Sequence, residues 1–383
     1  MGLLLRDVTT LLDGWYDPHW AESWDAVGLV CGDPDESVGK VLLAVDPAPS
    51  VVAEALEWGA DLVVCHHPLL LTAVHGVGAG TPKGRVVHDL VRGGVALFTA
   101  HTNADVPADG VNESLARAVG IVDPEVLLDA DDFAVDKLVA FVPTEHAGVV
   151  RTALTGAGGG AIGDYDSVSF TTTGEGRFHP LPGASPAVGS VGDLEVVGES
   201  RVEVVYPRQL RRRVVDALLA VHPYEEVVYD VLELAEPPGG HRSTRGHGRI
   251  GRLAAPVSLR GFADQVAAAL PSTAHGVRVA GDPDRLVGTV AVGSGSGDYL
   301  LDAVRGTDAD VYVTSDLRHH RAGEFMAHGG PALVDVAHWA AEWTWLPVVE
   351  RKLRAAVASR GDTVETRVSG VVTDPWTFRP DIT

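Results

Sequence analysis

Short apolar runs alternate with amphipathic segments between residues 40 and 105, and this alternation restricts the folds that the chain can adopt. The predicted elements are strands at 40–47, 61–68 and 95–105 and helices at 50–60 and 84–94. Ser50 is a candidate N-cap for the first helix, and Gly59 is a candidate for its end. Strands joined through helices pair in parallel, so we expect an α/β fold with a mainly parallel sheet and helices on its faces.

Charge and cysteine content limit the classes of function. The formal net charge is -22, which argues against a protein that wraps nucleic acid or lies on an anionic membrane. With Cys31 and Cys65 as its only cysteines, the chain has neither a disulfide framework nor a cysteine-rich zinc site. Residues 1–15 predict a short helix rather than a signal peptide, and no apolar run is long enough to span a membrane. We therefore expect a soluble cytoplasmic protein.

The texture of the sequence changes near residue 131 and changes back near residue 245. The middle is rich in Gly, Thr and Pro and then predicts a strand, a helix and a strand over residues 199–234, which is typical of an α+β unit. A Pro/Gly-rich stretch follows, and strand and helix patterns return after it. The predicted organisation is a core in two halves, 1–130 and 245–383, with an inserted α+β domain at 131–244.

Side chains that bind metals or move protons gather at four places, each just after a predicted strand. They are His66 with His67; His101 with Asn103 and Asp105; Asp316 with His319 and His320; and Asp335 with His338 and Glu342. In an open α/β sheet, ligands bind beyond the carboxyl ends of the strands. The four places are therefore expected to meet at one edge of the sheet.

The donor types in these clusters suit a metal site. His338 and Glu342 are four residues apart in a predicted helix and so lie on one face of it. Imidazole with carboxylate, and without thiolate, suits Zn, Mn, Fe, Co or Ni, and two such ions close together are a common hydrolytic arrangement. The alternative is that this pair is a solvated surface pair, and that His101 and Asn103 only hydrogen-bond to backbone near the site.

The adjacent histidines also have two interpretations. Neighbouring residues of an extended strand point to opposite faces, so His66 and His67 share one site only if the backbone turns there. Pro68 restricts the residue before it and is compatible with such a turn. Otherwise one histidine is buried and the other is solvated.

The run SGSG at 294–297 has the composition of a phosphate-binding loop but lacks its Lys-Ser/Thr ending. A tight turn after the preceding apolar strand is the favoured interpretation. Glycine there could still allow the backbone to approach a ligand closely.

Five motifs resemble, in order, the signatures of the NIF-three-like family, whose members are commonly labelled GTP cyclohydrolase I type 2 homologues. They are WDAVGLVCGDP (24–34), CHHPLLL (65–71), AHTNAD (100–105), TSDLRHH (314–320) and DVAHWAAE (335–342). The middle of the chain resembles the ferredoxin-like domain, similar to PII and CutA-type proteins, that is inserted in the longer members. Ala26 replaces the Asn that is usual in the first motif, which removes any hydrogen bond that this Asn would make.

The resemblance implies a dinuclear site that holds two divalent metal ions. The implied ligands are His66, His67, Asp105, His338 and Glu342, with Glu342 as the bridging carboxylate. Because these ligands lie on both sides of the insert, the two flanks must fold together.

The resemblance also implies a function and a partner. The expected activity is that of a metal-dependent hydrolase, either ring opening of GTP or cleavage of a phosphoester, with His320 as the catalytic acid or base. The alternative is a non-catalytic, metal-bearing regulator whose insert senses a ligand. Assembly into a homohexamer is expected, with GTP or another nucleotide as a possible small-molecule partner.

Overall fold

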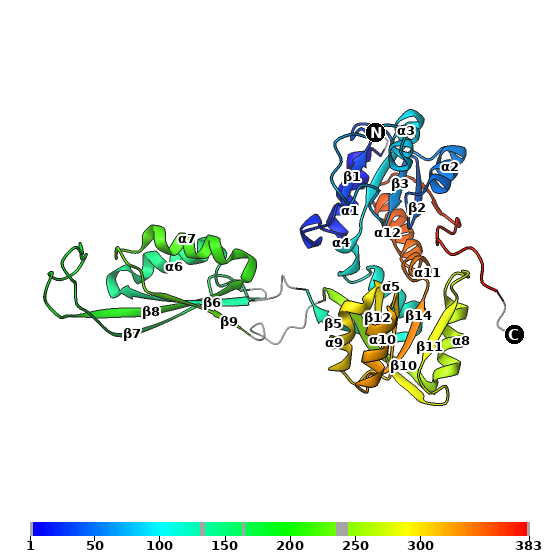
Figure 1. Cartoon of the computed structure of the whole chain (residues 1–383). Coiled ribbons are helices and arrows are strands. Elements are labelled where there is room, and N and C mark those ends of the chain that lie inside the picture. Colours follow the sequence, from blue (N-terminus) through cyan, green and yellow to red (C-terminus); the bar gives the residue numbers. More distant parts are fainter. Residues whose placement is uncertain (1–2, 131–134, 163–164, 235–243, 381–383) are drawn as a thin grey trace. The chain divides into compact units, whose positions relative to one another are not determined.

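The computed structural model describes residues 3–130, 135–162, 165–234 and 244–380, and the chain divides into two compact units (Figure 1). One unit comprises residues 1–129 and 244–383, and the other comprises 130–243. The sequence-based boundary at residue 131 lies outside the described residues. Among those residues, no helix has both the length and the apolar character needed to cross a membrane.

The first sheet of the larger unit has five strands in the order β1-β4-β3-β2-β15, and only β1 is antiparallel to its neighbour. The strands are β1 Gly28–Cys31, β2 Lys40–Ala44, β3 Leu62–Cys65, β4 Ala96–Thr99 and β15 Glu365–Val368. Helices α2 (Pro49–Trp58) and α3 (Pro82–Gly93) pack on one face. Helices α1 (Leu5–Trp15) and α12 (Leu346–Ser359) pack on the other.

The second sheet has six strands in the order β11-β14-β13-β12-β10-β5, and only β12, β13 and β14 run parallel. The strands are β5 Ile121–Asp129, β10 Gly246–Ser258, β11 Val277–Ala280, β12 Leu286–Ser296, β13 Val311–Ser315 and β14 Ala332–Val336. Helices α9 (Leu301–Arg305) and α10 (His319–Ala327) cover one face. Helices α5 (Val111–Ala118), α8 (Leu259–Ala269) and α11 (His338–Trp343) cover the other.

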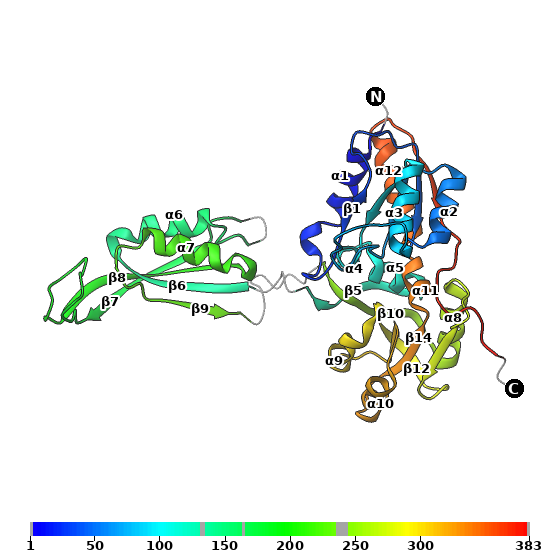
Figure 2. The ribbon, with the colours of Figure 1, turned by 45° about the horizontal axis from the view of Figure 1, so that its top comes forward.

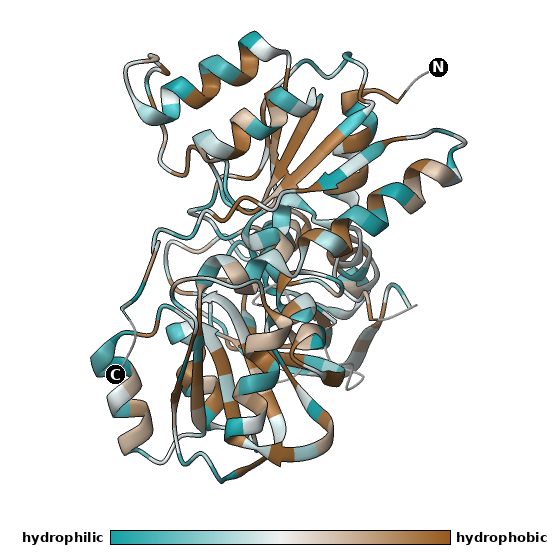
Figure 3. Ribbon diagram, turned by 90° about the vertical axis from the view of Figure 1, so that its right-hand side faces the viewer, coloured by the Kyte–Doolittle hydropathy of each residue, from teal (hydrophilic) through white to brown (hydrophobic). Residues whose placement is uncertain are grey.

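A single apolar cluster joins the two sheets and makes the two flanks of the insert one folding unit. It contains Val41 and Phe98 from the first sheet, Val290 and Val313 from the second, and Trp345 between them. The strands β2, β3 and β4 are buried on both faces, as is typical of parallel sheets, and they are hydrophobic along most of their length (Figure 3).

The prediction of an α/β core is confirmed, and the first sheet is mainly parallel as expected, but the second, mixed sheet was not predicted. The core has two sheets, and the second is half antiparallel because β5, β10 and β11 pair with strands distant in the sequence. Local hydrophobic patterns identify strands but contain no information on such pairings.

The smaller unit is a four-stranded antiparallel sheet with two helices, arranged along the chain as β-α-β-β-α-β (Figure 2). The elements are β6 Val135–Pro143, α6 Ala147–Gly156, β7 Ser169–Phe178, β8 Glu195–Pro207, α7 Arg211–Val221 and β9 Tyr229–Glu233. Leu138 and Val202 on the sheet pack against Val150 and Leu218 on the helices, so this unit has its own core.

Excision of residues 130–243 is expected to leave a folded core. Strand β5 pairs with β10 in an antiparallel ladder in which Asp129 lies opposite Gly246. After the excision, Thr244 and Arg245 are the two residues between Asp129 and Gly246, so changing them to Asn-Gly should close an ordinary two-residue hairpin. The shortened protein should bind metal with the stoichiometry of the full chain, measured by elemental analysis after gel filtration. Insoluble protein, or protein that no longer binds metal, would show that the core depends on the insert.

Candidate metal centre

The backbone turns immediately after β3, and this turn places both adjacent histidines on one side of the sheet edge. The amide of His66 donates to Ala44 O (3.2 Å) and the amide of His67 donates to Val45 O (2.8 Å). Consecutive amides of an extended strand do not bond to the same neighbouring strand, so the backbone is no longer extended. The two rings lie 5.1 Å apart between centroids, and the interpretation that they share one site is supported.

A third imidazole and a carboxylate, those of His101 and Asp105, follow strand β4. His101 follows β4 and precedes the single helical turn α4 (Thr102–Asp105), so the strand predicted to reach residue 105 ends earlier. A donor atom of His101 lies within 4.8 Å of donor atoms of His66 and His67. Asp105 Oδ1 is 3.7 Å from His66 Nε2. The sequence left open whether His101 belongs to the cluster, and the structure places it there.

Glu342 lies at the centre of the cluster and is buried. It projects from α11 beside His338, whose Nε2 is 2.8 Å from Glu342 Oε1. The same oxygen is 3.5 Å from His66 Nε2, and Glu342 Oε2 is 3.0 Å from His67 Nε2. The predicted placement of His338 and Glu342 on one helical face is confirmed, and three imidazoles surround one carboxylate.

An acceptor holds the Nδ1 atom of each of the four imidazoles. The pairs are His66 with Ala100 O (2.9 Å), His67 with Asp46 (2.7 Å), His101 with Asp25 (2.8 Å) and His338 with Asp316 (2.6 Å). This pattern is typical of metal-binding histidines, because the outer acceptor fixes the tautomer and leaves Nε2 as the donor.

The charges of the metal-free cluster support one another. Burial alone would raise the pKa of Glu342, but the imidazoles of His338, His67 and His66 hold it well below its usual value. The Glu342 carboxylate raises the pKa of His338 to about 11. Burial opposes protonation of His67, yet Glu342 and Asp46 raise its pKa to about 10. Burial also raises the pKa of Asp105 to about 7. In the metal-free protein, the protonated imidazoles of His67 and His338 therefore supply the positive charge that a metal ion would supply when bound.

Two buried polar atoms show that the cluster fits a metal. Among the described residues, His66 Nε2 and Glu342 Oε2 are both buried and lack a hydrogen-bond partner. The donor atoms form two sets, and within each set all of them lie within 4.8 Å of one another. The sets are His66, His67 and His101, and His67, His338 and Glu342. Nitrogen and oxygen donors without thiolate suit a first-row divalent ion.

Comparison with known proteins identifies the family of this chain. The model of the family Duf34/NIF3 (NGG1p interacting factor 3) matches residues 3–375. This chain belongs to the Duf34/NIF3 family. A Mycobacterium tuberculosis protein named GTP cyclohydrolase 1 type 2 homolog is 49% identical over 98% of this chain and 97% of its own length. A Bacillus subtilis protein of the same name is 36% identical over 97% of this chain and 98% of its own length.

Solved structures also resemble this Duf34/NIF3 chain along almost its whole length. A Bacillus cereus protein related to NIF3 is 35% identical, with a TM-score of 0.67 and coverage of 98% of this chain and 99% of the other. The Staphylococcus aureus protein SA1388 is 26% identical, with a TM-score of 0.70 and coverage of 99% of both chains. The prediction of the family from five short motifs is confirmed.

Metal binding by this NIF3-family chain is expected to release about two protons at pH 7.5, because His67 and His338 are protonated in the metal-free protein. Affinity should therefore rise with pH. The folded pKa values lie above the ordinary 6.5, so the charge pairs stabilise the metal-free protein fully below pH 6.5. This stabilisation is lost as the pH rises towards 10 and 11.

Calorimetric titration of Mn²⁺ or Zn²⁺ in buffers of different ionisation enthalpy measures the released protons. His67→Asn should lower the number by about one, whereas His75→Asn in an exposed loop should not change it. Release of no protons by the native protein would contradict the charge arrangement described above.

A cavity of about 490 Å³ opens beside the cluster, and its lining adds side chains that the sequence did not single out. Tyr299 Oη lies 3.3 Å from His247 Nδ1, and His247 Nε2 lies 3.8 Å from Glu22 Oε1. The ring of Trp24 meets His101 edge to face at 5.9 Å. Trp24 falls within a family motif, but no local pattern marks Glu22, His247 or Tyr299.

The SGSG run contributes to this cavity through Gly295. Gly295 has a φ of +66°, and a Cβ added there would lie 3.0 Å from Glu342 Oε1. A side chain at this position would therefore crowd the central carboxylate. The expected close approach of backbone at a glycine is therefore observed, but the tight turn is not, because β12 continues to Ser296 with an irregular register against β13 between Val292 and Ser296.

Several candidates from the sequence lie outside the cluster. His320 is exposed on α10, its ring is 5.1 Å from that of His319, and no hydrogen bond, ion pair or ring contact joins it to the cluster in the described part of the chain. Asp335 pairs with Arg278. Asn103 donates to Tyr16 O (2.6 Å), so it bonds to backbone as the alternative reading expected.

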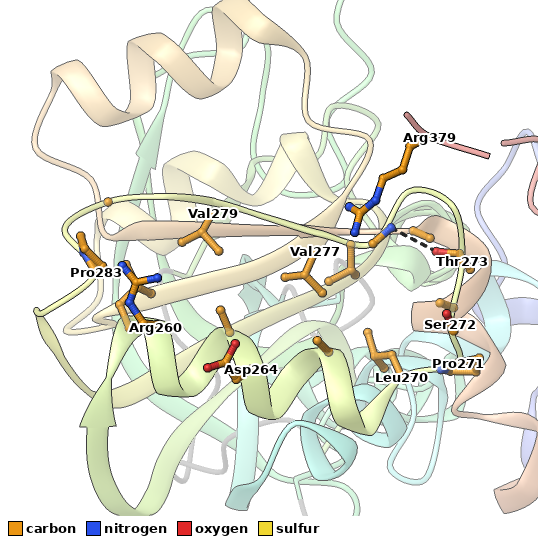
Figure 4. Close-up of a pocket in the computed structure, with 18 residues that line it drawn as sticks. Arg260, Asp264, Leu270, Pro271, Ser272, Thr273, Val277, Val279, Pro283 and Arg379 are labelled. Carbon is orange, nitrogen blue, oxygen red and sulfur yellow. Dashed lines mark hydrogen bonds between the residues drawn. The ribbon is translucent and has the colours of Figure 1, made fainter. Parts of the chain in front are cut away.

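A further cavity of about 570 Å³ lies between α8 and β11. Arg260 and Asp264 extend from the helix, and Arg379 reaches towards it from the C-terminal segment (Figure 4). Its lining is otherwise largely aliphatic, with separated charges and none of the histidines of the cluster. The cavity beside Glu342 is therefore the candidate for chemistry.

Proposed function

We propose that this chain is a metal-dependent hydrolase with a dinuclear centre. The observation that carries the proposal is the set of four imidazoles, each tethered through Nδ1, around one buried carboxylate. The residues that would hold the ions are His66, His67, His101, Asp105, His338 and Glu342. Six nitrogen and oxygen ligands exceed the three that a single open catalytic zinc takes from protein.

Glu342 is proposed as the bridging carboxylate. Its two oxygens face different imidazoles, His338 for Oε1 and His67 for Oε2. Two dications repel each other strongly at short range unless an anion lies between them. A buried carboxylate with both oxygens directed at ligand nitrogens supports this role.

A bound pair of divalent ions supplies Lewis-acid activation of water and of the electrophilic atom. The chain itself supplies shape and proton transfer. The aromatic side chains of Trp24 and Tyr299 line the cavity, which suits a planar substrate. Burial raises the pKa of Tyr299, so its hydroxyl stays protonated and can donate to His247 Nδ1. Protonated His247 would instead donate from Nδ1 to the Tyr299 oxygen and from Nε2 on the side of Glu22, and transfer of the Nε2 proton to a leaving group would return the neutral imidazole that accepts from Tyr299.

We propose a purine nucleotide such as GTP as the first substrate to test. Relatives named GTP cyclohydrolase 1 type 2 homolog support this choice. The reaction adds water at the imidazole carbon of the base and opens the ring to an N-formyl amine, and a second water then releases that carbon as formate and leaves the free amine. Phosphoesters are the second class, because the same centre can hydrolyse them.

The test is a turnover screen on protein loaded with Mn²⁺, Zn²⁺ or Fe²⁺, with formate and phosphate as readouts. His247→Asn and His320→Asn are compared at equal metal content. If His247 transfers the proton, its variant loses about 10²–10⁴-fold in kcat, while the His320 variant stays near wild type. The reverse result restores His320 to that role. Turnover that survives His66→Ala with loss of metal contradicts the metal-dependent mechanism.

The second candidate function is a non-catalytic, metal-bearing regulator. Its support is a separate cavity in the smaller unit. We propose that this unit is of the PII and CutA type, as its β-α-β-β-α-β order suggests, and that the chain forms a homohexamer. Sedimentation equilibrium tests the assembly. Saturable GTP binding without formate or phosphate release, at full metal loading, would favour the regulator.

A further inference from the structure

The sheet face of the smaller unit that α6 and α7 leave uncovered carries a cavity of about 610 Å³. On β6 and β8, Leu138 and Val202 pack against the helices. Phe141 and Glu199 lie at positions of the opposite parity and so point to the other face. Both line the cavity, together with residues from the segment 179–188. The cavity is therefore built between the open sheet face and this segment.

The cavity wall has the character of a small-molecule site. The rings of Phe178 and Tyr224 lie 5.9 Å apart between centroids. Leu181 and Val228 also line the cavity, and each is 63% exposed. Ligand sites typically have volumes of about 300–1,000 Å³ and largely apolar walls with a few polar groups. An aromatic pair with exposed aliphatic side chains meets that description.

The polar groups of the cavity are mostly acidic. Four carboxylates line it, and Arg177 is the one arginine or lysine among the described lining residues. Arg177 is paired with Glu175 at 2.7 Å. Within the described part of the chain, no cation pairs with Glu199 or Glu226. An apolar cavity with two carboxylates free of cations favours a positively charged ligand over an anion.

Glu199 is held in place for such a contact. Its Oε1 accepts the hydroxyl of Tyr224 at 3.0 Å. His222 accepts the Tyr224 amide at Nδ1 (3.2 Å) and donates from Nε2 to Phe141 O (3.0 Å), which fixes the backbone before the tyrosine. Gly176 makes room for the carboxylate, because a Cβ there would lie 2.3 Å from Glu199 Oε2.

We propose that this cavity binds a small organic cation with an apolar body, of the aryl- or alkylammonium class. The body packs on Phe178 and Tyr224, and the ammonium group meets Glu199 and Glu226. Aromatic faces add a favourable cation–π contribution. A neutral apolar ligand would bury these carboxylates without a partner, which costs free energy. The proposal is independent of the metal centre and of hydrolysis.

The test uses 2-phenylethylammonium against 2-phenylethanol, titrated into the metal-loaded full chain and followed by amide NMR shifts. The cation should bind at least about tenfold more tightly than the alcohol, as expected for one charge pair at a partly solvated site. Glu199→Gln and Gly176→Ala should each remove most of this preference. Asp230→Asn on β9 and Gly174→Ala, where an added Cβ meets nothing within 4 Å, are the matched controls and should leave it unchanged.

Three outcomes would overturn the proposal. The first is equal affinity for the two probes, or tighter binding of 3-phenylpropanoate. The second is full retention of the preference in both Glu199→Gln and Gly176→Ala. The third is no saturable shift of the cavity residues with the ammonium probe up to about 10 mM, which would place Kd at least about tenfold above 1 mM. The amide spectrum of each variant reports directly whether the unit is folded.

Discussion

Glu342→Gln is expected to reduce metal affinity by more than about 100-fold, which exceeds the effect usual for loss of an outer hydrogen-bond partner. Gln keeps the size of the side chain and removes the negative charge, so two adjacent cations would lose the anion between them. Three imidazoles surround this carboxylate at 2.8, 3.0 and 3.5 Å, and each depends on it. Metal content after dialysis against a weak chelator measures the effect.

The metal content of Glu342→Gln is compared with that of two other variants. Asp105→Asn removes a carboxylate at the edge of the cluster and should cost less metal than Glu342→Gln. Glu324→Gln on exposed α10 should change nothing. A Glu342→Gln protein that keeps two ions would exclude the bridging role.

Arg249→Met is expected to destabilise the core by about 3–5 kcal/mol, the cost of leaving buried polar groups without their partner. Arg249 is 1% exposed and donates to four carbonyl oxygens: Gly246 O (2.8 Å), Gly248 O (2.8 Å), Val106 O (3.0 Å) and Pro107 O (2.9 Å). Its guanidinium is also 3.7 Å from buried Glu113. Methionine can fill the space but satisfies none of these acceptors.

The same substitution should weaken metal binding, because Val106 and Pro107 directly follow the proposed ligand Asp105. Urea unfolding of the metal-free protein measures stability, and calorimetry measures affinity. Arg252→Met, at an exposed position on the same strand, should change the free energy of unfolding by less than about 0.5 kcal/mol. A loss below 1 kcal/mol in Arg249→Met would show that water or backbone movement replaces the guanidinium.

The parts of the fold that local patterns determine were predictable, and the long-range parts were not. The strands and helices between residues 40 and 99 lie where the apolar runs indicated, and Gly59 ends α2 with a φ of +72°. Ser50 is not the N-cap, because Pro49 occupies the first helical position after Ala48. The antiparallel half of the second sheet depends on pairings between distant segments, which no local period reveals.

The candidate site shows the same division. The motifs contain His66, His67, Asp105, His338 and Glu342, and all five lie together. Whether His101 joined them could not be decided from spacing, since its placement depends on where β4 stops and α4 begins. The acceptors that tether the imidazoles could not be matched to them either. Asp46, for example, belongs to the segment after β2 and reaches His67 only through parallel pairing of β2 with β3.

The way in which the insert joins the core has a consequence for chain entropy. The core brings its own ends together, with Asp129 opposite Gly246. The insert does the same, because Asp136 lies opposite Glu233 on adjacent strands. When one unit folds, it therefore brings together the two chain ends from which the other unit continues. Most of the entropy cost of joining those ends is then already met. An unfolded insert would act on the core as one long flexible loop, and the cost of closing such a loop grows by only about 0.6 kcal/mol for each doubling of its length. The core can thus tolerate large changes in the length and stability of the insert.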